Sequence, residues 1–200
     1  MTNLQFMARI NQSLALPSQY ATGAFGAPTG YKNNTERYAS NSNAEVAKKI
    51  RACPDGVFMY DCKGLGMAQL YGFCGDPNAR YGGAVYKKDD IPDFSIKSLH
   101  KHCNEWKDDG CPENAMVIGE WMRTASNDHV GFYAGNGKVA ECTQWYECKC
   151  RLSDIKDRDW KGHGKLKYID YLPEEKPEYI KAGAVVCPHC KKEIALYTEV

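Results

Sequence analysis

The chain has 200 residues, of which 43% are hydrophobic and 26% charged, a composition that suits one globular domain with a core and a small appendage. Its 26 basic and 25 acidic residues leave a formal net charge of +1, which gives no whole-chain reason to expect a nucleic acid or an anionic membrane as a partner. No apolar run approaches the length of a membrane span, and the first twenty residues lack a secretory signal, so we expect synthesis in the cytoplasm.

Helical spacing alternates with turn signals in the first third of the chain. In chain order we expect a helix over residues 3–16, a glycine-punctuated loop over 20–26 and a polar, turn-rich stretch over 29–42. A short helix over 43–52 and a strand over 57–60 follow. Pro17 ends the first helix.

A further helix should begin directly after Asp61, because the residues beyond Cys62 return to helical spacing and aspartate is a favoured N-cap. One more helix is expected over 95–106. Strands are expected over 115–122, 129–134, 138–143, 149–152 and 166–171, with a hairpin turn at Gly135-Asn136-Gly137. Helices followed by antiparallel strands predict an α+β fold, with the sheet packed on the helix that carries Cys62.

A proline-bounded break at 173–177 separates two parts of the chain. We expect a main domain over residues 1–172, and a linker with a short cysteine-bearing tail over 173–200. No internal repeat is present.

Cys62 and His129 supply the two groups that a cysteine nucleophile needs. A thiol at a helix N-terminus is easier to ionise, and a neighbouring imidazole can take its proton. The helix-start N–H groups, including that of Cys62, are then candidate donors to an oxyanion.

Glu141 is the candidate for orienting the imidazole of His129. The register of the hairpin decides whether it can. With a two-residue loop, Asn136-Gly137, Glu141 points away from His129; with a three-residue loop the two share a face, and Cys142 points away. A glycine at the last loop position suits the three-residue form.

The same residues also have ordinary explanations. Reduced cysteines are commonly buried apolar side chains, and a lone histidine on a strand is more often a satisfied polar residue than a base. With ten cysteines and five histidines in the chain, chance pairings are easy.

Several blocks of the chain resemble the NlpC-type cell-wall cysteine peptidases, and among these the catalytic domains of bacteriophage endolysins. The blocks are DCKGL at 61–65, HVGFY at 129–133, GNGK at 135–138, YATGAFG at 20–26, AECT at 140–143 and the closing segment 160–171. They occur in family order over about residues 5 to 172.

The resemblance implies a papain-like fold and hydrolysis of an amide in the peptide stem of peptidoglycan, either by an endopeptidase at a γ-D-glutamyl bond or by an amidase. It implies that Cys62 is the nucleophile, His129 the general base and Glu141 the orienting residue. Tyr20 would line the site, and Asp61 would contact a free amine of the stem. An enzyme of this kind would leave the cytoplasm with the help of a separate membrane-permeabilising protein and act on the cell wall.

Two positions depart from the family pattern. Lys63 stands where many members have serine, so it would either attract a substrate carboxylate or remain solvated. Glu141 stands where a histidine or neutral polar group is common. A carboxylate should stabilise the imidazolium, so we expect a low apparent pKa for the Cys62 thiol.

The remaining cysteines suggest a second kind of site. Cys187 and Cys190 have the spacing of one zinc knuckle, and Cys148 and Cys150 could complete four ligands. No cofactor is required for the proposed catalysis, so zinc there would be structural. Free thiols or a disulfide remain alternatives.

We therefore expect a peptidoglycan hydrolase of the cysteine peptidase class, in the manner of a phage or prophage endolysin. One alternative keeps the fold but transfers the acyl group to an amine, as a thiol acyltransferase or transglutaminase-like enzyme does. The other is a non-catalytic, zinc-stapled binding module with a buried Cys62. The host, the diamino acid, the bond and the oligomeric state are open.

Overall fold

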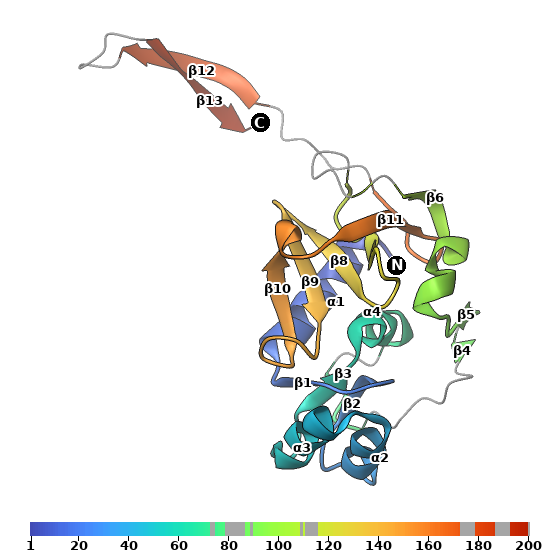
Figure 1. Ribbon diagram of the computed structural model, residues 1–200. Coiled ribbons are helices and arrows are strands. Elements are labelled where there is room, and N and C mark those ends of the chain that lie inside the picture. Colours follow the sequence, from blue (N-terminus) through green and yellow to red (C-terminus); the bar gives the residue numbers. More distant parts are fainter. Residues whose placement is uncertain are drawn as a thin grey trace.

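The computed structural model describes residues 1–72, 75–78, 87–88, 90–108, 110, 116–172, 179–186 and 193–199. Within these ranges, a six-stranded antiparallel sheet and a three-stranded sheet lie on either side of helix α4 (Cys62–Tyr71), which occupies the middle of the view in Figure 1. The predicted α+β class is confirmed, as is the packing of a helix that begins at Cys62 on an antiparallel sheet.

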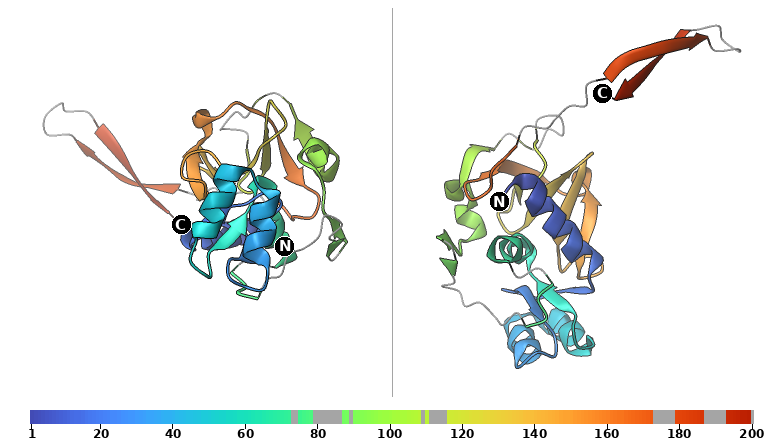
Figure 2. Two further views of the ribbon diagram at one scale, coloured as in Figure 1. Left: turned by 60° about the horizontal axis from the view of Figure 1, so that its bottom comes forward. Right: turned by 180° about the vertical axis from the view of Figure 1, so that it is seen from behind.

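Helix α1 (Asn3–Ala15) confirms the first predicted helix. Its start is held by a capping box, in which the Thr2 hydroxyl accepts from the Gln5 N–H and the Gln5 side chain accepts from the Thr2 N–H. Phe6 anchors the buried face, since its ring meets the edge of Phe132 with centroids 5.5 Å apart. Seen from behind in Figure 2, α1 therefore covers the large sheet.

The smaller sheet has the order β1-β3-β2, with β1 and β3 parallel and β2 antiparallel to β3. Its strands are β1 (Ser18–Tyr20), β2 (Phe25–Pro28) and β3 (Phe58–Tyr60). The strand expected over 57–60 is confirmed. The stretch over 20–26 is a loop only in its middle, because both of its ends pair with β3.

Two helices cover the smaller sheet, and only one was predicted. Helix α3 (Ala44–Ala52) starts at Asn43, whose side chain accepts from the Val46 N–H at 3.0 Å. Helix α2 (Asn34–Asn41) lies in the stretch expected to be turns. Its sequence is polar, but it forms because Tyr38 and Ala39 are buried in a core shared with α3.

The larger sheet has the order β10-β9-β8-β7-β11-β6. Its strands are β6 (Cys103–Lys107), β7 (Trp121–Thr124), β8 (Val130–Gly135), β9 (Lys138–Cys142), β10 (Cys150–Asp154) and β11 (Trp160–Leu166). The β8–β9 hairpin matches its prediction closely, and β10 begins within its predicted range.

Three other predictions for this region were wrong in whole or part. Residues 95–106 form a 3-10 helix, η1 (Ile96–His102), and then strand β6, rather than one helix. Of the strand predicted over 115–122, only the last two residues belong to β7. Residues 116–120 are not in a strand, and residue 115 lies outside the described part of the chain. The strand predicted over 166–171 is found earlier in the chain, as β11 (Trp160–Leu166). The residues after Leu166 are mostly turn.

Strand β11 escaped prediction because its buried face is built from glycine. A Cβ at Gly162 would come within 2.5 Å of the Trp106 ring, and one at Gly164 within 2.9 Å of it. The indole therefore packs directly on the strand backbone. An apolar alternation, which is the usual signal of a half-buried strand, is absent from the sequence there.

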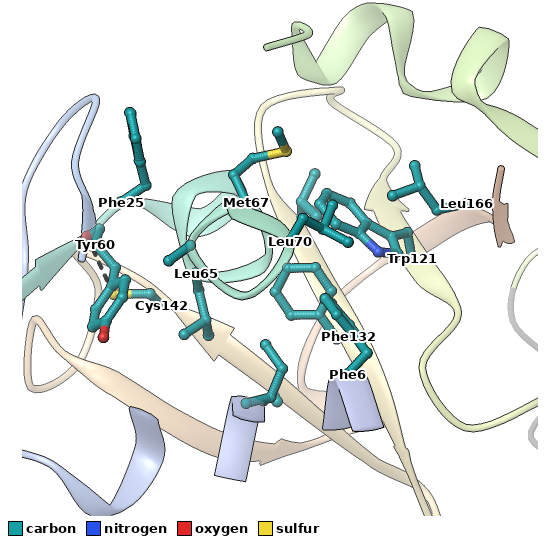
Figure 3. Packing of buried hydrophobic residues seen from close by; sticks show 14 of the residues in the cluster. Phe6, Phe25, Tyr60, Leu65, Met67, Leu70, Trp121, Phe132, Cys142 and Leu166 are labelled. Atoms are coloured by element: carbon teal, nitrogen blue, oxygen red, sulfur yellow. Dashed lines mark hydrogen bonds between the residues drawn. The ribbon is translucent and has the colours of Figure 1, made fainter. Parts of the chain in front are cut away.

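Helix α4 is packed on nearly all sides, as Figure 3 shows along its axis. A Cβ at Gly64 would lie 1.9 Å from the Ala24 carbonyl oxygen, so the helix touches the backbone of the loop before β2. A Cβ at Gly66 would lie 2.6 Å from the rings of Phe132 and Trp121. The two glycines thus let the helix approach both sheets and set the position of its first residue, Cys62.

Two short antiparallel ladders complete the described chain. They pair β4 (Lys87–Lys88) with β5 (Ile91–Pro92), and β12 (Tyr179–Val186) with β13 (Glu193–Glu199). The predicted linker, 173–177, falls outside the described residues, so the domain boundary stays a prediction. Among the helices described, none has the length and apolar character needed to span a membrane.

Gly66→Ala should destabilise the fold by about 1–3 kcal/mol, since the added methyl meets two fully buried rings. The gain in helix propensity, about 1 kcal/mol, is smaller than this overpacking. The measurement is the urea midpoint at constant m-value. Lys48→Ala, on the exposed side of α3, is the matched control and should change stability by less than about 0.5 kcal/mol. A Gly66→Ala protein as stable as the wild type would contradict this description of α4.

Candidate active site

Cys62 is the first residue of α4, and Asp61 fixes that helix start. One Asp61 carboxylate oxygen accepts from the Gly64 N–H at 2.5 Å, and the other accepts from the Gly23 N–H at 2.9 Å. The carboxylate therefore caps the helix and ties the 20–26 loop to it. Burial raises the pKa of Asp61, and the two N–H donors and Lys63 oppose that rise.

Cys62 is only 5% exposed, and its sulfur lies against the start of β8. Burial, assisted by the Asp61 carboxylate, raises the pKa of the thiol to about 12. The N–H groups of Val130, Lys63 and Cys62 itself act in the opposite direction by donating to the sulfur. These surroundings do not produce the low pKa expected from the sequence, so a thiolate here needs a neighbouring base that takes the proton and remains beside the sulfur as a cation.

His129 and Glu141 face each other across the β8–β9 hairpin. His129 Nε2 lies 2.6 Å from Glu141 Oε2. Phe132 stands opposite Ala140 in this hairpin, which is the register that puts the two side chains on one face. Cys142 points to the other face, where its thiol donates to the Tyr60 carbonyl oxygen at 3.3 Å.

The hairpin reaches that register by a route the sequence analysis did not predict. The loop is the two-residue Asn136-Gly137, with φ of 49° and 67°, closed by the Gly135–Lys138 pair. A register shift between Tyr133 and Gly135 then restores the pairing that a three-residue loop would have given. Gly135, with φ of 83°, supplies the left-handed residue that this bulge needs.

Glu141 is fully buried, with 0% exposure, and its carboxylate is bonded to the side chains of three residues. Arg158 donates to it from Nε at 2.5 Å and from Nη2 at 3.3 Å, and the Ser153 hydroxyl donates as well. Burial alone would raise the pKa of this carboxyl, but the bonds from His129, Arg158 and Ser153 outweigh burial and lower it to about 2. Glu141 is therefore an anion at neutral pH.

Cys62 and His129 open into one cavity of about 530 Å³. Its walls come from β1, α4 and the loops around β7, β9 and η3 (Ile155–Asp157). The lining residues are Tyr20, Cys62, Thr124, Ala125, Ser126, Asp128, His129, Thr143, Gln144, Trp145, Asp157, Arg158 and Asp159. The sulfur and the imidazole are thus accessible to the same small molecule or peptide. Burial raises the pKa of Tyr20 above its usual range, so its hydroxyl stays neutral there.

Two residues predicted to bind substrate lie elsewhere. Lys63 is neither solvated nor in the cavity wall, because its ammonium group forms an ion pair with Asp93 and donates to the Phe94 carbonyl oxygen at 2.7 Å. Asp61 is likewise absent from the lining, and both of its oxygens accept backbone hydrogen bonds. In this structure both side chains hold α4 to its neighbours.

Cys148 and Cys150 lie in two different cores, and the predicted zinc site that would use them stays a prediction. The Cys148 thiol accepts from Gln19 Nε2 at 3.1 Å within the core beneath α2 and α3, whereas Cys150 belongs to the core of the larger sheet. Cys187 and Cys190 lie outside the described residues. In the described part of the chain, no three histidine, cysteine or acidic side chains are grouped so that they could hold a metal ion.

Sequence reasoning missed three residues of this site. Arg158 contacts Glu141, Trp160 lies beside His129 with ring centroids 5.8 Å apart, and Trp145 forms part of the cavity wall while 63% exposed. All three belong to loops or strand starts, where periodicity carries no signal. Of the three, only Trp145 could have been recognised from the sequence, as a tryptophan within a polar stretch.

No protein-family model matches the chain, and no curated protein matches its sequence. Solved structures similar to it include the peptidoglycan hydrolase RipB from Mycobacterium tuberculosis, 17% identical with a TM-score of 0.48, where the match covers 84% of this chain and 65% of RipB. A P60 domain of an antigen from Mycobacterium avium subspecies paratuberculosis is 18% identical with a TM-score of 0.47, covering 84% of this chain and 96% of that domain.

The Resuscitation Promoting Factor Interacting protein RipA is 16% identical with a TM-score of 0.45, and the match covers 82% of this chain and 61% of RipA. The chain thus spans less than two thirds of RipB and RipA. At this level of similarity the likenesses transfer no residue role, substrate or activity to this chain.

His129→Ala should move the alkylation of Cys62 by iodoacetamide to much higher pH. Without the imidazole, the thiol keeps the raised pKa that burial and Asp61 impose, so thiolate forms only in strong alkali. In the wild type, His129 can take the proton at lower pH. Site-resolved mass spectrometry measures the rate at each pH.

Cys53 provides the internal control, because it is half-buried and lies outside the cavity. Its alkylation profile should be the same in both proteins. Coincident Cys62 profiles for wild type and His129→Ala would mean that no proton passes between the two residues.

Proposed function

We infer that this chain is a peptidoglycan hydrolase of the cysteine peptidase class. The observation that carries the proposal is a thiol at a helix N-terminus that shares one cavity with an imidazole, itself held by a buried carboxylate. These are the nucleophile, base and orienting group of acyl-transfer catalysis. The cell-wall substrate is supported by the chain's resemblance to NlpC-type enzymes over residues 5–172.

In the first half of the reaction, His129 takes the Cys62 proton and the sulfur attacks the carbonyl carbon of a stem-peptide amide. The oxyanion that forms is stabilised by backbone N–H groups at the start of α4. Those of Cys62 and Lys63 point toward the sulfur, whereas the Gly64 N–H is occupied by Asp61. His129 then gives its proton to the leaving amine as the C–N bond breaks, and a thioester remains on Cys62.

In the second half, a water molecule loses a proton to His129 and attacks the thioester. The C–S bond breaks, the product leaves with a free carboxyl group, and the thiol regains its proton. Glu141 favours the imidazole tautomer that carries its proton on Nε2 and leaves Nδ1 as the basic nitrogen, because Nε2 is bonded to the carboxylate.

Tyr20 is the predicted substrate contact that remains in the cavity wall. Asp61 and Lys63 are left out of the proposed binding site, since their polar atoms bond to neighbouring parts of the fold. The finer part of the proposal is the role of a phage or prophage endolysin, made in the cytoplasm and acting on the wall after release. It rests on the resemblance alone, as does the choice between endopeptidase and amidase.

Digestion of purified peptidoglycan tests the proposal. Wild type should release stem-peptide fragments with a new amine and a new carboxyl terminus, and Cys62→Ala should reduce the rate by at least about a thousandfold. Mass analysis of the fragments identifies the bond. Cys53→Ala, which removes a thiol outside the cavity, should digest like the wild type. Equal release by wild type and Cys62→Ala would end the hydrolase proposal.

The same digestion separates hydrolysis from acyl transfer. With a primary amine added in excess, a hydrolase still yields free carboxyl groups, whereas an acyltransferase yields the amide of the added amine. Predominant amide products would replace the hydrolase proposal with the transferase alternative.

Trp145→Ala should raise KM for a soluble stem-peptide substrate by about fivefold with little change in kcat. The ring is exposed on the cavity wall, so its loss removes about 1 kcal/mol of contact without harming the core. Steady-state kinetics measure both constants. Leu152→Ala, exposed on β10 and outside the cavity, is the control. An unchanged KM in Trp145→Ala would exclude this ring from substrate binding.

A further inference from the structure

Arg158 is the most constrained cation of the site. Its side chain is only 14% exposed, although it forms part of the cavity wall. Two of its nitrogens donate to Glu141, and Nη2 also donates to Thr143 Oγ1 at 3.1 Å. A planar guanidinium held at three points has one orientation, and it holds the carboxylate in one orientation too.

The charge of Arg158 changes what Glu141 does to His129. A buried carboxylate without a counter-ion would strongly favour the imidazolium, and a histidine that remains a cation cannot accept the thiol proton. With Arg158 bound, the Glu141–Arg158 pair has no net charge. Its oxygen still accepts the hydrogen bond that orients the ring.

We propose that Arg158 is a positioning residue of this site, which fixes Glu141 and balances its charge so that His129 is oriented without being locked as a cation. The proposal rests on the proposed function, in that it assigns His129 the work of a base. It also accounts for the glutamate at position 141, where NlpC-type enzymes commonly have a histidine or a neutral polar group. Glu141 and Arg158 together carry no net charge, as a single neutral group would.

The other charged and titratable groups around the pair belong to several elements and would remain in an Arg158 variant. Around the sulfur these are Asp61 on the α4 start, Tyr20 on β1 and Cys142 on β9. Asp128, beside His129, is held as an anion by the Ser126 and Thr124 hydroxyls, which lower its pKa. Asp157 and Asp159 also line the cavity.

Because these neighbours are neutral or acidic, Arg158 is the cation among the residues that line the cavity, all of which are described. Its removal should make every proton in the site harder to release. The pH at which Cys62 becomes reactive should therefore move upward.

Arg158→Gln and Arg158→Lys test the proposal through the pH profile of Cys62 alkylation, which needs no substrate. In Arg158→Gln the profile should move to higher pH by about one unit, the low end for one nearby charge. In Arg158→Lys the charge is kept but the two-pronged contact is lost. Its profile should stay close to that of wild type, while kcat on peptidoglycan falls because Glu141 is less well held. Arg51→Gln, at an exposed ion pair with Glu36, is the matched control and should change neither.

Alkylation separates this proposal from the function itself. If wild type digests no peptidoglycan but Arg158→Gln still shifts the alkylation profile, the hydrolase proposal fails and the proposed role of Arg158 is supported. A folded Arg158→Gln protein with the wild-type alkylation profile would overturn the proposed role of Arg158. If that variant does not fold, Arg158→Lys decides: lowered kcat at an unshifted profile supports the proposal, and wild-type kcat or a profile shifted by a unit overturns it.

Discussion

The buried carboxylate of Glu141 is the interaction on which the candidate site depends. A charge with no access to solvent is costly unless every lone pair finds a donor, and here the donors come from three separate segments. His129 precedes β8, Ser153 lies on β10, and Arg158 follows η3. Strands β8, β9 and β10 are neighbours in the larger sheet, so the sheet already places His129 and Ser153 beside Glu141. The buried anion adds Arg158 from outside these strands, and its bond to Nε2 sets the orientation of the imidazole.

The second constraint is the close approach of α4 to its surroundings. His129 directly precedes β8 of the larger sheet, whereas the helix start that presents the sulfur is tied by Asp61 to the loop between β1 and β2 of the smaller sheet. The two halves of the site meet only because α4 packs against both sheets. Gly64 and Gly66 permit that approach, and Phe132 and Trp121 limit it, so the sulfur position is a product of packing as much as of capping.

The parts of the site that depend on local rules could be predicted from the sequence. The cap at Asp61, the helix after Cys62 and the hairpin at Gly135-Asn136-Gly137 all follow from preferences of neighbouring residues. Features that depend on tertiary contacts could not. Helix α2 forms because Tyr38 finds a core, β11 is a strand because Trp106 packs on its glycines, and Lys63 turns away from the cavity because Asp93 is within reach. Arg158 belongs to the same group, since its partner Glu141 lies seventeen residues earlier in the chain, with β10 and η3 between them.

The electrostatics of the four central groups also limit how the chemistry can begin. With a neutral thiol and imidazole, the set of Cys62, His129, Glu141 and Arg158 has a net charge of zero. Loss of the thiol proton to bulk water would leave a net anion beside Asp61 in a buried setting, which is why burial raises the pKa of that thiol so far. Transfer of the same proton to His129 leaves the net charge unchanged, and it places the new cation against a carboxylate that is already ionised. The direct transfer therefore avoids the cost of adding net charge to a poorly solvated site, and the imidazole becomes a necessary part of the nucleophile.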